Sequence, residues 1–169
     1  MTSAHCSLAI EIGIDDDVKW PRACDERLPQ LRRAVELAAN YGKCSLGQIN
    51  VRICTDETIH AVNRQYLDHD YPTDVISFPY EFEPPFVEGE LIVSSETAAT
   101  QSHRYSAGTS GEDDVWHEMI LYVVHGCLHL VGLDDQDDAG RRAMRCAEDF
   151  VMRRIGLPAP VWPSSPDVS

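Results

Sequence analysis

Lysine is nearly missing from this chain. Lys19 and Lys43 are the only two, and with the arginines they make 14 basic residues against 28 acidic ones, so the formal net charge is −14 at pH 7. A negative excess of this size argues against broad electrostatic attachment to nucleic acid or to anionic lipid. A local basic groove stays possible, so any nucleic-acid contact must depend on a few arginines and on a bound cation.

The chain also lacks long apolar runs and paired cysteines. No segment reaches the roughly 18 uninterrupted apolar residues of a membrane span, and the N-terminus has no basic region followed by an apolar core, as an export signal would have. The six cysteines form no Cys-x-x-Cys pair. Reduced thiols in the cytoplasm are the simplest interpretation. We therefore expect a cytoplasmic protein that does not associate with membranes.

Apolar periodicity predicts an α+β domain. The length of 169 residues is enough for one core, and an apolar fraction of 43% fits a globular protein. Alternating apolar residues predict strands, and apolar residues at helical spacing predict helices. The strands are expected at residues 7–14, 48–54, 75–80 and 90–94, and the helices at 26–41, 56–67, 95 to about 105, 115–131 and 138–155. We expect a small mixed sheet of about four strands packed with about five helices.

Prolines and glycines mark the expected breaks between these elements. Residues 82–89 hold Pro84, Pro85 and Gly89 and are expected to form a loop between two strands. Gly156 is expected to end the last helix, and four prolines follow it. Residues 1–156 are therefore predicted to form a single metal-binding domain, and residues 157–169 a mostly disordered, proline-rich tail.

Two histidines stand four residues apart at the end of the most apolar helix. Side chains at this spacing lie on one helical face, so His125 and His129 can point at one ion. Gly132 can take the left-handed conformation that ends a helix, and the acidic residues after it can return to the histidines. A catalytic zinc site has three protein ligands and a water. His125, His129 and Asp135 are the predicted ligands. Nearby carboxylates leave the third ligand open: Asp134, Asp137 and Asp138, of which the last two also suit N-capping of the next helix.

Four short motifs follow one another in a set order. They are Asn63 with Tyr66, the run PTDVISFP at residues 72–79, the run GELI at 89–92 and the run HGCLHLVGLD at 125–134. Over roughly residues 45–155 they resemble the bacterial YbeY family of rRNA maturation endoribonucleases. The resemblance implies a metal-dependent, single-strand-specific endoribonuclease with a small mixed sheet, flanking helices and a zinc held by the helix motif. It also implies a role in maturation of the small-subunit rRNA 3′ end and in ribosome quality control, with single-stranded rRNA and the small ribosomal subunit and its proteins as partners.

Two positions depart from the family's pattern. The family's helix motif usually closes with Asp-His, the histidine being the third ligand, and here Asp135 takes that place. A third ligand that is a carboxylate should weaken the Lewis acidity of a zinc ion and shift preference somewhat toward harder ions such as Mn²⁺. The family also tends to carry an arginine, taken to serve the substrate or phosphate, where this chain has Leu67. Arg64 lies on a different helical face. It is a candidate for substrate binding, as are Thr73 and Asp74, for which a capping role in the turn is an equal alternative.

Two other functions compete with the nuclease. The spacing H-x-x-x-H-x-x-G-x-x-D resembles the metzincin peptidases, but these need glutamate directly after the first histidine as the general base, and this chain has Gly126 there. A non-catalytic ribosome-assembly factor with a structural metal is the second alternative, which Leu67 and the negative charge favour. Structural zinc sites usually have four protein ligands, and Asp134 or Asp137 could supply the fourth. The number of protein ligands therefore discriminates catalysis from structure.

Overall fold

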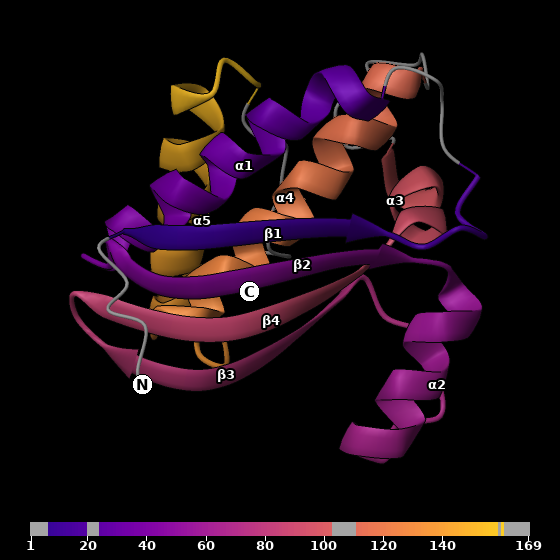
Figure 1. Cartoon of the computed structure of the whole chain (residues 1–169), viewed down its shortest axis with the longest axis horizontal. Helices are drawn as coiled ribbons and strands as arrows, with labels where there is room; N and C mark the ends of the chain where they lie inside the picture. The colour runs from indigo at the N-terminus through magenta and orange to yellow at the C-terminus, as the bar shows by residue number, and fades with distance from the viewer. Residues whose placement is uncertain (1–6, 20–23, 103–110, 159, 161–169) are drawn as a thin grey trace, which may run out of the picture.

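The computed structural model describes residues 7–19, 24–102, 111–158 and 160, without the side chains of residues 24, 25 and 112. Within these residues, one sheet of four strands is accompanied by five helices (Figure 1), which confirms the α+β fold with a small mixed sheet. The strands are β1 (Leu8–Ile14), β2 (Leu46–Cys54), β3 (Val75–Glu83) and β4 (Phe86–Ser94), and the helices are α1 (Cys24–Tyr41), α2 (Asp56–Leu67), α3 (Ser95–Gln101), α4 (Glu112–Leu130) and α5 (Asp138–Arg154).

The strand order is β1-β2-β4-β3, with β3 at one edge. Strands β1, β2 and β4 are parallel, and β3 runs antiparallel to β4. In β2, the alternation read from the sequence puts Ile49, Val51 and Ile53 in the core and leaves Arg52 on the opposite face. The sheet therefore has one strongly apolar face and one mixed face.

Helices α1 and α4 pack against the apolar face of the sheet, and α5 packs against these two helices (Figure 1). Helix α4 is the central one: Met119, Val123 and Leu128 have no more than traces of exposed surface, and such an apolar helix must be buried. Helix α2 packs on the other face at one end, through Ile59 against Ile76 and Ile92 of the strands. Among the helices of the described residues, α2 is the one that contacts this second face.

The expected loop at residues 82–89 is wrong. Strands β3 and β4 continue to Glu83 and Phe86, which pair with each other, and only Pro84 and Pro85, joined by a cis peptide bond, form the turn. The pairing extends this far because Val87 is fully buried in the core. Gly89 lies within β4, and the lack of a side chain there makes room for Leu130, since a Cβ atom would lie 2.7 Å from the Leu130 side chain.

The ends of two expected segments fall outside the described residues. Helix α3 is capped by Ser94, whose Oγ accepts a hydrogen bond from the Thr97 amide at 3.1 Å, and it ends at Gln101. Residues 103–105, into which it was expected to continue, lie outside the description, as does most of the expected tail after residue 157. Within the residues described, no helix combines the length and the apolar character that crossing a membrane requires.

Candidate metal centre

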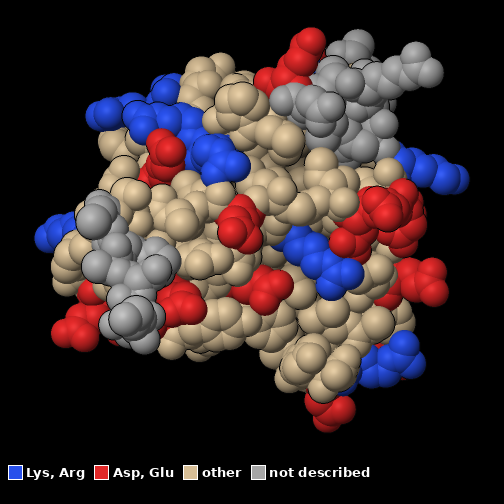
Figure 2. All heavy atoms as spheres, in the orientation of Figure 1, with Lys and Arg blue, Asp and Glu red and all other residues tan. Residues whose placement is uncertain are grey.

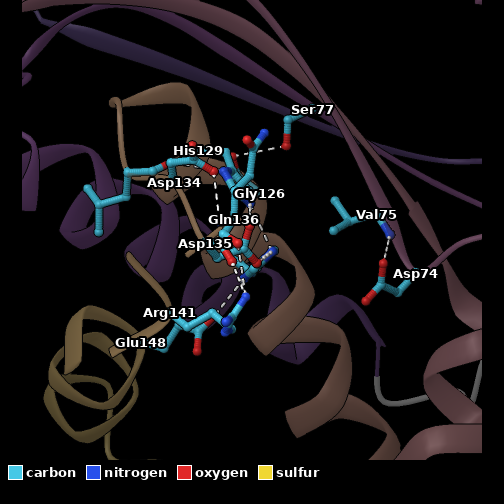
Figure 3. Close-up of polar contacts among 12 residues, drawn as sticks. Asp74, Val75, Ser77, Gly126, His129, Asp134, Asp135, Gln136, Arg141 and Glu148 are labelled. Carbon is cyan, nitrogen blue, oxygen red and sulfur yellow. Dashed lines mark hydrogen bonds and ion pairs between the residues drawn. The ribbon is translucent and has the colours of Figure 1, made fainter. Parts of the chain in front are cut away.

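The end of helix α4 brings the three predicted metal ligands together. Gly132 has a φ of +91°, and its amide donates to the carbonyl of His129 at 3.1 Å, so the chain turns sharply after the helix. The following loop lies beside the helix end (Figure 3) and returns Asp135 to the histidines. The Asp135 carboxylate oxygens lie 3.7 Å from Nε2 of His125 and 3.6 Å from Nε2 of His129. Two imidazoles and one carboxylate thus converge on one point.

Hydrogen bonds on the far side of each ring decide which nitrogen faces that point. Nδ1 of His125 lies 2.7 Å from Oε1 of Glu148, and Nδ1 of His129 lies 2.9 Å from the carbonyl oxygen of Leu133. A carbonyl and an ionised carboxylate only accept hydrogen bonds, so each neutral ring carries its proton on Nδ1 and keeps a lone pair on Nε2.

These two lone pairs provide a test of whether the site suits a metal. The two Nε2 atoms are 3.0 Å apart, and lone pairs this close repel unless a proton or a cation lies between them. Asp135 adds a negative oxygen to the same place. The residues therefore fit a divalent cation with nitrogen and oxygen ligands.

Glu148 is the functional residue that sequence reasoning missed. It lies on helix α5 with only 1% of its surface exposed, among the buried side chains of Met144, Ala147 and Val151. An acidic residue on the buried face of an amphipathic helix is the signal that could have found it. Burial alone lowers the pKa of His125, but the hydrogen bond and charge of Glu148, with the charges of Asp135 and Asp74, raise that pKa above its ordinary value. Glu148 therefore stabilises positive charge at His125.

The other acidic residues after the helix are engaged elsewhere. Oδ1 of Asp134 accepts from the Gln136 amide at 3.2 Å, Asp138 pairs with Arg141, and Oδ1 of Asp137 caps helix α5 by accepting from the Gly140 amide at 2.6 Å. In the part of the chain that the structure describes, His125, His129 and Asp135 are the group that could bind a metal ion, with ligand atoms within 4.8 Å of one another.

The two histidines open into a cleft of about 450 Å³. Thr73 and Asp74 also line it, and Oδ1 of Asp74 accepts hydrogen bonds from the Val75 amide at 2.8 Å and from Oγ1 of Thr73 at 3.1 Å. These contacts show Asp74 capping the start of β3, which is the capping role that the sequence left as an alternative. Leu67 lines the cleft, whereas Arg64 lies outside the lining with its Nε 3.9 Å from Asp70. Among the described residues that line the cleft, there is no arginine or lysine.

Helix α4 approaches the sheet closely at Gly126, which lies between His125 and His129 in the chain. A Cβ atom at this position would lie 2.9 Å from the side chains of Leu91 and Val75. Oγ of the half-buried Ser77 donates to the Gly126 carbonyl at 3.1 Å, so this serine has a structural role between strand and helix. The glutamate that a metzincin peptidase needs after its first histidine would have no room here, and the packing therefore disfavours the peptidase alternative.

Fold and site together define a class of protein: an α+β protein whose central helix presents two histidines, one turn apart, to a cleft beside a carboxylate from the following loop. Within that class the chain belongs to the YbeY family, since the family model described as Endoribonuclease YbeY matches residues 16–156.

Individual relatives agree with this assignment. An endoribonuclease YbeY of Rhodopirellula baltica is 44% identical over 166 residues, which cover 95% of this chain and 84% of that protein. One from Bacteroides thetaiotaomicron is 42% identical over 113 residues, covering 67% and 77% of the two chains. A Thermotoga maritima protein solved in solution superimposes with a TM-score of 0.54 at 23% identity, over 86% of this chain and 90% of the other. At that identity the likeness shows the fold alone.

Proposed function

We propose that this chain is a metal-dependent endoribonuclease that cleaves single-stranded RNA. The observation that carries the proposal is the convergence of three side chains at the wall of a cleft: the Nε2 atoms of His125 and His129 are 3.0 Å apart, and oxygens of Asp135 lie 3.7 and 3.6 Å from them. Membership of a family whose curated relatives are named endoribonucleases supports RNA as the substrate. A divalent ion bound here supplies an acidified water and polarises a phosphoryl oxygen, which is what hydrolysis of a phosphodiester needs.

The chain's own residues have distinct roles in this proposal. Nε2 of His125, Nε2 of His129 and a carboxylate oxygen of Asp135 hold the ion, and Glu148 fixes the ring of His125 from behind. Three protein ligands, rather than four, would leave one coordination position of the ion for water or substrate, and this favours catalysis over a structural metal. Thr73 and Asp74 line the cleft, which supports the proposal that they contact the substrate, and a contribution from Arg64 stays a prediction.

Zinc is the proposed metal. Mn²⁺ is the alternative, because a carboxylate in place of a third histidine improves the relative fit for this harder ion. Asp135 adds a hard, negatively charged oxygen to two imidazoles, which weakens the Lewis acidity of zinc and improves the relative fit for Mn²⁺. The test compares the metal content of protein purified without chelator with that of an Asp135→His variant. The variant should retain more zinc relative to manganese, and equal metal content and preference in both proteins would contradict this assignment.

The proposed substrate is the 3′ end of the small-subunit rRNA. Maturation of that end, contact with the small ribosomal subunit and its proteins, and a part in ribosome quality control come to the proposal from the family resemblance. The relatives' names support an endoribonuclease. The proposed cytoplasmic location comes from the unpaired cysteines and the lack of an export signal in the sequence.

Cleavage of short rRNA fragments tests the function. Wild-type protein loaded with zinc or manganese should cleave a single-stranded fragment and spare the same fragment annealed to its complement. His129→Ala should lose more than roughly 100-fold of the rate, because loss of an outer-shell partner alone typically costs 10–100-fold. His60→Ala is the matched control. His60 lies on helix α2, outside the candidate metal centre, and its ring contacts Asp70 at 2.8 Å. Equal cleavage by wild type and His129→Ala would contradict the proposal, and a metal-loaded wild type that cleaves nothing would favour the assembly-factor alternative.

A further inference from the structure

Exposed aromatic side chains gather at one edge of the sheet. The described part of the chain exposes seven large apolar side chains, and two of them, Tyr41 and Phe150, pack against each other with ring centroids 5.7 Å apart. The remaining five all lie between residues 66 and 82: Tyr66, Leu67, Tyr71, Tyr80 and Phe82. Single exposed apolar residues are ordinary on a protein surface, but a concentration of them marks a binding surface.

Three aromatic rings of this region line a groove of about 500 Å³ between helix α2 and the mixed face of the sheet. The rings of Tyr66 and Phe78 meet edge to face, with centroids 5.8 Å apart and an angle of 77°. The ladder between β3 and β4 shifts register between Pro79 and Glu81, so Tyr80 is the extra residue of a β-bulge. Its hydroxyl donates to Oε2 of Glu90 at 3.1 Å. Tyr66 and Tyr80 are thus held in place although 63% and 60% of their surfaces are exposed.

The groove continues the candidate metal cleft around the edge strand. Leu67 and Pro79 line the cleft, and their sequence neighbours Tyr66 and Phe78 line the groove. Because successive residues of a strand point to opposite faces, β3 forms the wall between the two hollows. A flexible polymer lying in the cleft can therefore cross the edge strand and place its next units in the groove.

The charges that line the groove indicate whether it binds the phosphates or the neutral rings of such a polymer. Arg52 is the groove's one basic group among the described residues, and it is paired with Asp15 through two hydrogen bonds of 2.9 Å, while Glu90 adds negative charge. Figure 2 shows mainly uncharged surface with isolated acidic groups along β3, and the basic residue in the last turn of α2, Arg64, has its Nε 3.9 Å from Asp70. Phosphates therefore gain little here, whereas neutral, flat rings gain stacking on exposed aromatic faces.

We propose that this groove is a nucleobase subsite, in which unpaired nucleotides that flank the cleaved bond stack on Tyr66, Phe78 and Tyr80. The inference rests on the proposed function, because it takes the polymer in the cleft to be single-stranded RNA. It also accounts for how a chain with a net charge of −14, and with no arginine or lysine among the described residues that line its cleft, holds RNA: the bases, not the phosphates, carry the affinity.

Binding of a labelled single-stranded oligoribonucleotide to the full-length, metal-free protein tests the subsite without cleavage. Fluorescence anisotropy should show Tyr66→Ala and Tyr80→Ala binding roughly 5- to 100-fold more weakly than wild type, which corresponds to the loss of one stacked base. Tyr66→Phe and Tyr80→Phe should bind as wild type, because they keep the ring. The control is Tyr41→Ala, which removes an exposed tyrosine from helix α1 and should leave affinity unchanged. Affinity should also depend only weakly on salt, since each phosphate contact on a single strand would add about 0.7 to the slope against log salt.

Several results would overturn the subsite. The proposal would be contradicted if the wild-type protein did not bind the oligonucleotide, or if the alanine variants bound it as tightly as Tyr41→Ala. Either result would favour a protein partner as the occupant of the groove. A steep salt dependence would give the affinity to phosphates instead. The proposed function fails separately: tyrosine-dependent binding by a metal-loaded protein that cleaves nothing would uphold the subsite and contradict the nuclease.

Discussion

At the scale of single residues, the hydrogen bond between Glu148 and His125 is the contact that orients a proposed metal ligand. It is 2.7 Å long, its acceptor is almost fully buried, and it joins helix α5 to the end of helix α4. By fixing the proton on Nδ1, it leaves Nε2 free to bind a metal. Oε2 of Glu148 has no hydrogen-bond partner among the described residues, so the carboxylate's one polar contact there is with the ligand ring.

Replacing Glu148 with glutamine should lower metal affinity by about 10- to 100-fold, as expected for an outer partner of a ligating histidine. Glutamine keeps the size of the side chain, so the effect reports the lost charge rather than a cavity. Chelator competition measures the affinity. Asp149→Asn is the matched control, because Asp149 is the next residue on α5 and pairs with Arg153 at 2.9 Å on the surface. An equal loss of metal affinity in both variants would contradict this role of Glu148, because the loss would then follow from the change in overall charge.

Glu148 should also set the protonation of His125. Burial lowers the pKa of His125, and Glu148 contributes the largest of the effects that raise it above its ordinary value. In Glu148→Gln the burial remains and the raising effect goes, so the pKa should fall. An NMR titration of the metal-free protein measures this shift directly. A His125 pKa that is the same in both proteins would show that the 2.7 Å contact does not act on the ring in solution.

At the scale of elements, the position of His125 depends on how closely helix α4 packs against the sheet. The helix lies against β3 and β4 at Gly126, where only the absence of a side chain allows the approach, and His125 is the preceding residue. The distance between helix and sheet therefore sets where the first ligand stands. A change at Gly126 must alter both packing and metal binding.

Gly126→Ala should destabilise the fold by about 1–2 kcal/mol. Overpacking costs about 1–3 kcal/mol, and the better helix propensity of alanine returns at most about 1 kcal/mol. Metal affinity should fall as well, because the helix must move away from Leu91 and Val75. Chemical denaturation measures the first effect. Gly13→Ala is the control, since no atom lies within 4 Å of a Cβ atom there, and it should change stability little. A Gly126→Ala protein as stable as wild type would contradict the close approach.

Local patterns in the sequence predicted some elements and missed others for identifiable reasons. Helix α2 begins and ends at the predicted residues, 56 and 67, because Thr55 caps it and an amphipathic stripe runs its whole length. The β3–β4 turn was missed because Gly89 acts as a breaker in sequence, while in space it makes room for Leu130. Glu148 was missed because its partner lies 23 residues away on another helix. Contacts between elements leave little trace in a local pattern.

For the whole molecule, metal binding should appear as added stability. Ligands that bind only the folded state stabilise it by about 2.7 kcal/mol at a concentration 100 times Kd. In a chain of this size that corresponds to a rise in Tm of about 5–10 °C. Thermal unfolding of metal-free protein with and without zinc or manganese measures the rise. It should vanish in His129→Ala and persist in His60→Ala, and a rise of the same size in His129→Ala would move the metal away from this centre.

Cleavage measured against metal occupancy tests the central claim most directly. Metal-free protein is titrated with zinc or manganese, and the initial rate of cleavage of a single-stranded rRNA fragment is recorded together with the bound metal. The rate should rise from near zero in proportion to the bound ion, reach its plateau at one ion per chain, remain in Asp134→Ala and disappear in Asp135→Ala. Cleavage at full rate by the metal-free protein, or an unchanged rate in Asp135→Ala, would contradict a site built from His125, His129 and Asp135.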